Sequence, residues 1–134
     1  MSLEIHRREH EGVVIFDLKG RLTVGEASNL REKVNECVKE GKNKIILNLE
    51  DVDYIDSTGL GGMVICFTTV KKSGGALKLL NLTKRNIELI VLTKLHTVFE
   101  VFSDEQDAVN SFFPNREIKR FDILNFIRQQ QDQD

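Results

Sequence analysis

The sequence predicts an α/β domain in which strands and helices alternate, with parallel strands in the centre and right-handed crossovers between them. Two observations predict this class. Short apolar runs at 44–49 (KIILNL) and 76–82 (ALKLLNL) are typical of strands, and the first is apolar enough to be covered on both faces. Segments with the apolar spacing of amphipathic helices, over 26–40 and 60–70, precede these two runs.

The N-terminal residues predict a β-hairpin. Apolar and polar residues alternate from Leu3, with Arg7 as the one polar exception, and VVIFDLKG at 13–20 follows after the short link HEG. The first helix is then expected over 26–40, with Gly41 as its stop. Its apolar face comprises Ala27, Leu30, Val34, Cys37 and Val38.

The second helix follows the strand at 44–49, and Gly74 and Gly75 close it. Its apolar face comprises Leu60, Met63, Val64, Phe67 and Val70. After the strand at 76–82, residues 84–95 predict a third helix. The positions in register on that helix are Ile87, Ile90, Val91 and Lys94.

The remaining elements are shorter. Residues 98–104 predict a short strand, and 104–113 predict a short helix that Asp104 can cap. Pro114, the only proline, marks the expected end of the domain. We therefore divide the chain into a domain of residues 1–114 and an extension of residues 115–134.

The C-terminal extension is amphipathic at its start and polar at its end. Four apolar residues fall roughly on one helical face, which suits a helix docked on the domain, a self-association segment that makes a homodimer, or a partner-binding segment. These residues are Ile118, Phe121, Leu124 and Ile127. The last six residues, QQQDQD at 129–134, are expected to be disordered.

Composition excludes several classes of function. The 134 residues include 19 basic and 21 acidic ones, a net charge of −2, so no broad attraction to nucleic acid is implied. No stretch reaches the roughly 20 apolar residues that span a bilayer, and the N-terminus lacks the apolar core of a signal peptide. Cys37 and Cys66 stand far apart, which suits small core residues rather than a disulfide or a zinc site. A cytoplasmic protein with no membrane or direct nucleic-acid partner is expected.

The stretch DYIDSTGLGGM at 53–63 contains the candidate functional residues, two hydroxyls between a carboxylate and three glycines. It lies between an apolar strand and an amphipathic helix, so Asp56 or Ser57 is expected to cap the helix and the glycines to let the chain turn. A serine hydrolase would need a histidine to orient the serine, and the sequence lacks the G-x-S-x-G elbow. A phosphate-binding loop would need a lysine in the first helical turn, and the first lysine after this stretch is Lys71.

A fourth interpretation makes Ser57 a phosphoryl acceptor. The helix dipole tolerates an added charge of about −1.5 to −2 at this position. Phosphate beside the carboxylates of Asp51, Asp53 and Asp56 would add repulsion on the surface that a partner meets, which makes a local switch that leaves the fold unchanged.

The segment YIDSTGLGGM resembles the signature of STAS-domain anti-sigma factor antagonists, in which an aspartate, a serine and a further small residue precede Gly-Leu-Gly. The resemblance extends over roughly residues 3–113 and includes GRLTVGEASNLREKV at 20–34 and KIILNLEDVDYID at 44–56. It implies a single STAS-like domain, a mixed sheet of four or five strands with helices packed mainly on one face.

The resemblance also implies a partner-switching function. Members bind an anti-sigma factor that is itself a serine kinase, release it when the serine matching Ser57 is phosphorylated, and are reset by a serine phosphatase. The implied contact surface is Asp56, Ser57, Thr58, Gly59, Leu60 and Gly61. No catalytic residue, cofactor or metal is implied.

Two features depart from the family pattern. Many phosphorylatable members carry an aspartate where GRLT places Thr23, and the extension after Pro114 lies outside the usual domain. These departures keep a second hypothesis open, a STAS-type scaffold or subunit of a lipid-transport or stress-sensing complex. Whether Thr58 also accepts phosphate is left open by the motif.

Overall fold

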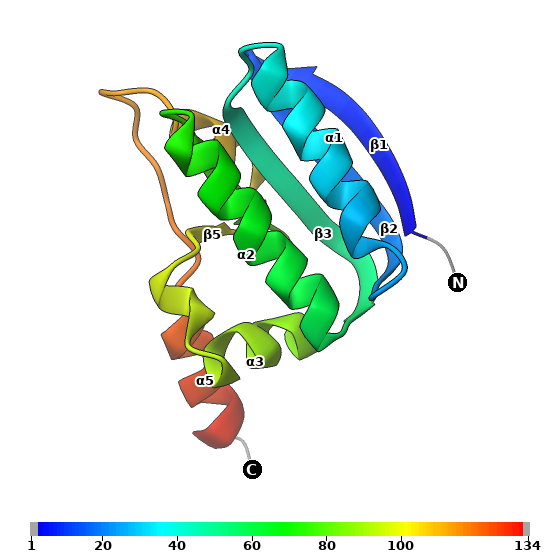
Figure 1. Cartoon of the computed structure of the whole chain (residues 1–134). Helices are drawn as coiled ribbons and strands as arrows, with labels where there is room; N and C mark the ends of the chain where they lie inside the picture. The colour runs from blue at the N-terminus through cyan, green and yellow to red at the C-terminus, as the bar shows by residue number, and fades with distance from the viewer. Residues whose placement is uncertain (1–2, 133–134) are drawn as a thin grey trace.

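The computed structural model describes residues 3–132 and contains one mixed five-stranded sheet with the strand order β1-β2-β3-β4-β5 (Figure 1). β1 and β2 pair antiparallel, and every later pair of neighbours is parallel. The strands are β1 (Leu3–His10), β2 (Val13–Leu22), β3 (Lys44–Ile55), β4 (Ala76–Leu80) and β5 (Val101–Phe102). The mixed α/β sheet expected from the sequence is confirmed.

Helices cover the two faces of the sheet unequally. The helices are α1 (Ala27–Lys39), α2 (Ser57–Lys72), α3 (Lys84–Leu92), the short 3-10 helix η1 (Leu95–Thr97), α4 (Glu105–Asn110) and α5 (Ile123–Asp132). Helices α1 and α2 lie side by side on one face, and α4 lies behind the sheet (Figure 1). The larger apolar core lies under α1 and α2, and a smaller cluster that includes Phe102 and Val109 lies under α4. The expectation of helices mainly on one face is therefore confirmed.

The local signals explain most of these elements. Glu11 and Gly12 both have positive φ (53° and 83°), the conformation of the two-residue hairpin turns that suit the twist of the strands. Asp104 accepts a hydrogen bond from the Asp107 N–H at 3.0 Å and caps α4, as expected. Cys37 and Cys66 are buried free thiols, and burial raises the pKa of Cys66 to about 12. Both are core residues, as expected.

Several boundaries differ from the sequence expectation; β4 ends at Leu80 rather than 82, and α4 ends at Asn110 rather than 113. Three further differences have a clear structural reason. β3 continues to Ile55, because Val52 and Ile55 keep facing the core beyond the apolar run 44–49, across shifts in its register with β2. Helix α3 ends at Leu92, and Lys94, predicted to be helical, has a φ of 63°. A positive φ cannot continue a right-handed helix. β5 is limited to Val101–Phe102, the two residues of 98–104 with register partners on β4.

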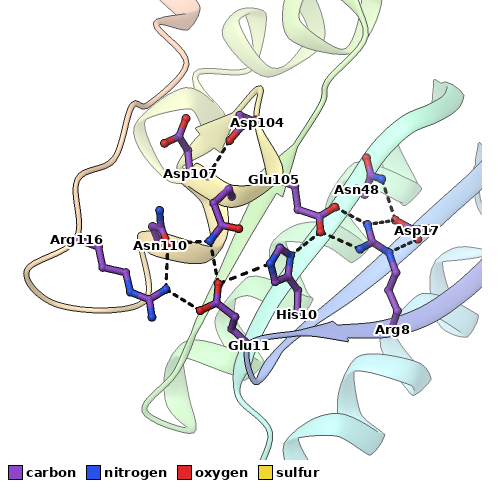
Figure 2. A network of polar contacts seen from close by, with 11 residues as sticks. Arg8, His10, Glu11, Asp17, Asn48, Asp104, Glu105, Asp107, Asn110 and Arg116 are labelled. Carbon is purple, nitrogen blue, oxygen red and sulfur yellow. Dashed lines mark hydrogen bonds and ion pairs between the residues drawn. The ribbon is translucent and has the colours of Figure 1, made fainter.

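An ion-pair network at one end of the sheet joins the hairpin to α4 (Figure 2). Arg8 of β1 contacts Asp17 of β2 and Glu105 of α4, each at 2.6 Å. Asn48 of β3 donates to Asp17 at 2.8 Å, and the His10 ring lies 2.7 Å from Glu105. Four elements are therefore held together by one arginine and its carboxylates. These charged contacts lower the pKa of Glu105 to about 2, chiefly through its hydrogen bonds to Arg8.

The network continues beyond α4 to the segment that follows Pro114. Glu11 accepts a hydrogen bond from Gln106 at 2.8 Å and pairs with Arg116 at 3.2 Å. Asn110 receives hydrogen bonds from both of those side chains, at 3.0 Å each. The start of the extension is thus attached to the hairpin turn.

The C-terminal extension docks on the domain. The Phe121 N–H donates to the Val101 carbonyl at 3.0 Å, and Ile123 is buried against the main core. Asp122 caps the helix by accepting from the Asn125 N–H at 2.9 Å. The packed face of α5 comprises Ile123, Phe126 and Ile127, whereas Leu124 is 48% exposed.

The helical face predicted for the extension was therefore wrong. Ile118 and Phe121 precede the helix, and the cap at Asp122 sets its phase so that Leu124 points to solvent. Helix α5 also includes residues 129–132, which the sequence predicts to be disordered, because they continue its docked turns. Residues 133 and 134 of that stretch lie outside the described residues.

We expect Glu105→Gln to lower the free energy of unfolding at pH 7 by about 1–2 kcal/mol, because it removes the carboxylate that pairs with Arg8 and His10. The folded-state pKa of Glu105 is lowered from 4.5 to about 2. Its stabilisation is therefore complete above pH 4.5 and is lost as the pH falls toward 2. Urea unfolding of wild type and variant should show a difference in the free energy of unfolding that becomes smaller over this pH range.

Asp107→Asn is the matched control, since it removes another carboxylate from the first turn of α4. Asp107 has no ion-pair partner among residues 3–132. If wild type and Glu105→Gln differ in free energy of unfolding by the same amount at pH 7 and at pH 2.5, the ion pairs of Glu105 do not stabilise the fold.

Candidate functional site

The site lies where β3 passes into α2. β3 ends at Ile55, and Asp56 is the N-cap of α2, in extended conformation with ψ of 178°. One carboxylate oxygen of Asp56, Oδ1, accepts from the Gly59 N–H at 2.7 Å, which satisfies a backbone donor that the helix leaves free. Asp56 rather than Ser57 is therefore the cap.

The same aspartate fixes the loop between β2 and α1. Its second oxygen, Oδ2, accepts from the Val24 N–H at 3.1 Å, and its own N–H donates to the Leu22 carbonyl at 3.1 Å. The Thr23 carbonyl accepts from the Glu26 and Ala27 N–H groups at 2.9 and 3.0 Å, which closes the turn into α1. Thr23 therefore lies beside the start of α2, although it is 33 residues away from Asp56 in sequence.

The three glycines of the motif have different surroundings. A Cβ atom on Gly59 would overlap the Leu22 carbonyl oxygen and lie 2.8 Å from its carbon. A Cβ on Gly62 would lie 3.0 Å from the Ala27 Cβ. A Cβ on Gly61 would meet nothing within 4 Å. Gly59 and Gly62 thus allow close packing of α2 on the end of β2 and on α1, whereas Gly61 has no such function inside the domain.

The structure divides the six expected contact residues into two groups. Ser57, Thr58 and Gly61 are exposed, and Asp56 is half-buried. Gly59 is buried and Leu60 is only 8% exposed, so these two support the surface from beneath. The exposed group lies on the first turns of α2, next to Val24, whose side chain is 69% exposed.

Sequence reasoning missed part of this surface. Val24 was not singled out, and neither were Arg21, Tyr54 and Arg85, whose side chains stack together at the same end of the sheet. Arg21 and Tyr54 pair in register between β2 and β3, but only the registered sheet reveals this neighbourhood. The one signal in the sequence was the position of Arg21, directly before Leu22, and of Tyr54, two residues before Asp56, because Leu22 and Asp56 join β2 to α2.

The surroundings of Ser57 do not match a hydrolase triad. His6 and His10 belong to β1, and His96 belongs to η1. Within residues 3–132, no histidine forms a hydrogen bond with Ser57, and His10 is engaged with Glu105. The lysines of α2 lie in its last turn, and no group of three potential metal ligands occurs in the described part of the chain. The arrangement presents a serine hydroxyl at a helix start, where negative charge is tolerated.

A family model for the STAS domain matches residues 4–108. The chain belongs to the STAS domain family. The anti-sigma-B factor antagonist of Bacillus subtilis (strain 168) is 36% identical over 109 residues, which cover 81% of this chain and 99% of that protein. The resemblance to STAS-domain anti-sigma factor antagonists is thereby confirmed. None of the helices over residues 3–132 has the length and apolarity needed to cross a membrane.

Solved structures of this family have the same architecture. TM1081 from Thermotoga maritima superposes with a TM-score of 0.76 at 27% identity, covering 81% of this chain and 93% of that one. The Bacillus cell fate determinant SpoIIAA in its phosphorylated form gives a TM-score of 0.64 at 20% identity, covering 81% and 98% of the two chains. The docked extension lies beyond the residues that the STAS model matches.

We expect the substitutions Gly59→Ala and Gly61→Ala to separate packing from surface function. Gly59→Ala should lower the free energy of unfolding by about 1–3 kcal/mol, because the new methyl group collides with the Leu22 backbone. Gly61→Ala should leave it unchanged or raise it by up to about 1 kcal/mol, since alanine favours the helix and the site has room. Urea unfolding measures both values, and equal destabilisation by the two variants would contradict this account.

Proposed function

We propose that this chain is an anti-sigma factor antagonist that switches partners through phosphorylation of Ser57 and so regulates sigma-factor-dependent transcription. The observation that carries the proposal is the placement of Ser57. It is the first residue of α2 and is exposed, and it follows a cap that holds the helix start against β2. The curated relative from Bacillus subtilis is an anti-sigma-B factor antagonist.

The geometry favours a switch that acts at the surface. The Ser57 hydroxyl makes no side-chain hydrogen bond within the described residues, so a phosphoryl group would break no internal contact. It would add a charge of about −1.5 to −2 beside the Asp56 carboxylate. The helix dipole offsets part of this repulsion inside the domain, but a partner seated on the same surface meets the full added charge.

The partner in this proposal is an anti-sigma factor of the serine-kinase type, and a serine phosphatase restores the unmodified state in the cytoplasm. Unphosphorylated antagonist binds the anti-sigma factor through Ser57, Thr58, Gly61 and the adjacent Val24. The phosphorylated form of the structural relative SpoIIAA supports a phosphorylation switch on this fold.

We expect Ser57→Ala to abolish phosphate transfer from the kinase-type anti-sigma factor of the source organism, because it removes the acceptor hydroxyl. Incubation with this kinase and labelled ATP, followed by peptide mass spectrometry, locates the modified residue. Thr58→Val is the matched control, since it removes the neighbouring exposed hydroxyl and leaves Ser57 intact.

The proposal requires that Thr58→Val accept phosphate at the wild-type level. Undiminished labelling of Ser57→Ala, or loss of labelling only in Thr58→Val, would overturn the assignment to Ser57. A pull-down that recovers transporter subunits and no kinase-type protein would favour the alternative of a scaffold in a lipid-transport or stress-sensing complex.

A further inference from the structure

Two arginines from different elements stack on one tyrosine near the start of α2. The guanidinium carbon of Arg21, Cζ, lies 4.7 Å from the centre of the Tyr54 ring, and that of Arg85 lies 4.8 Å from it. Arg21 and Tyr54 are register partners on β2 and β3, and Arg85 is in the first turn of α3. Both distances are in the range of a cation–π interaction. We call these residues the Arg21–Tyr54–Arg85 group.

Within the described residues, neither arginine of this group forms an ion pair with a carboxylate. Within residues 3–132, no carboxylate oxygen lies within 4.0 Å of Arg21 or Arg85, although Asp51 and Asp53 are on the same strand as Tyr54. Four other arginines do have such partners: Arg7, Arg8, Arg116 and Arg120. Both guanidinium groups of the stacked pair are on exposed residues. Two positively charged groups on exposed residues are therefore held against the same tyrosine ring.

Stacking prepares these guanidinium groups to bind an anion. Each guanidinium group lies over the Tyr54 ring, and no carboxylate within residues 3–132 engages its N–H donors. These donors can form paired hydrogen bonds with a carboxylate of a partner. Holding long side chains in one arrangement before binding lowers the entropy cost of the complex. The backbone beneath is also fixed, because Asn86 of α3 donates to the Val52 carbonyl of β3 at 3.0 Å.

The group is close enough to Ser57 to share its partner. Tyr54 and Ser57 are three residues apart, so their Cα atoms are separated by at most about 10 Å. The Asp56 N–H donates to the Leu22 carbonyl. Leu22 directly follows Arg21, and Asp56 follows Tyr54 by two residues, so this hydrogen bond holds the two segments side by side. A stable protein interface covers about 800 Å² on each partner, an area wide enough to extend from Ser57 to residues about 10 Å away.

We propose that the Arg21–Tyr54–Arg85 group is the part of the partner surface that selects the anti-sigma factor by binding an acidic side chain on it. This inference rests on the proposed function. No carboxylate within residues 3–132 pairs with Arg21 or Arg85, so these two side chains attract an acidic side chain of the partner and repel a basic one.

The test is calorimetric titration of the kinase-type anti-sigma factor of the source organism with wild type, the double variant Arg21→Gln/Arg85→Gln and the control Lys72→Gln. Lys72 is an exposed cation in the last turn of α2, has no ion-pair partner among residues 3–132, and lies about 22 Å along the helix from Ser57. Titrations are run at 0.05 M and 0.5 M salt, and urea unfolding midpoints confirm that each variant is folded.

We expect the double variant to bind at least about 10-fold more weakly than wild type at 0.05 M salt, while Lys72→Gln binds like wild type. The difference should shrink at 0.5 M salt, because the screening length falls from about 10 Å at 0.1 M toward 3 Å at 1 M. This pattern would establish recognition of an acidic side chain by the group.

Other outcomes overturn the inference. Equal affinity of wild type and double variant would remove the Arg21–Tyr54–Arg85 group from the interface and leave the proposed function intact. A loss of affinity of the same size at both salt concentrations, or an equal loss of affinity in Lys72→Gln, would show that the group makes no local contact with an acidic side chain. Absence of any binding by wild type would overturn this inference and the proposed function together.

Discussion

The close approach of α2 to the end of β2 is the constraint on which the site depends. Gly59 lies against the Leu22 backbone so tightly that no side chain fits between them. The Asp56 cap then joins both segments, because it receives N–H groups from Gly59 and Val24 and donates its own to Leu22. The start of the helix and the loop after β2 therefore form one rigid surface, and Ser57 is exposed at its centre.

This rigidity has a functional consequence. A phosphoryl group on a fixed, exposed hydroxyl changes the charge of the surface without having to reorganise the interior. The contacts that hold the rest of the sheet lie elsewhere. The Arg8 network joins the hairpin to α4, and Arg116 attaches the start of the extension (Figure 2). The Phe121 N–H attaches it further along by donating to the Val101 carbonyl. The ion pairs that hold the hairpin and the start of the extension are thus separate from the surface on which Ser57 is exposed.

Much of the fold could be predicted from the sequence, because apolar periodicity and helix-stop glycines act locally. The hairpin, the central strands and the Asp104 cap are examples. Errors arose where a local pattern was overridden, as at Lys94, whose left-handed backbone ends the helix, and at Leu124, where the cap at Asp122 sets the helix phase.

The site was only partly predictable for a related reason. The motif places Ser57 at a helix start, but the difference between Gly59 and Gly61 depends on Leu22, which is distant in sequence.

The measurement that tests the account most directly is amide hydrogen exchange by NMR on the protein with and without phosphate on Ser57. The account predicts changes confined to residues 22–24 and 54–61, with protection of the rest of α2 retained. Loss of protection throughout α2 or β3 would contradict it.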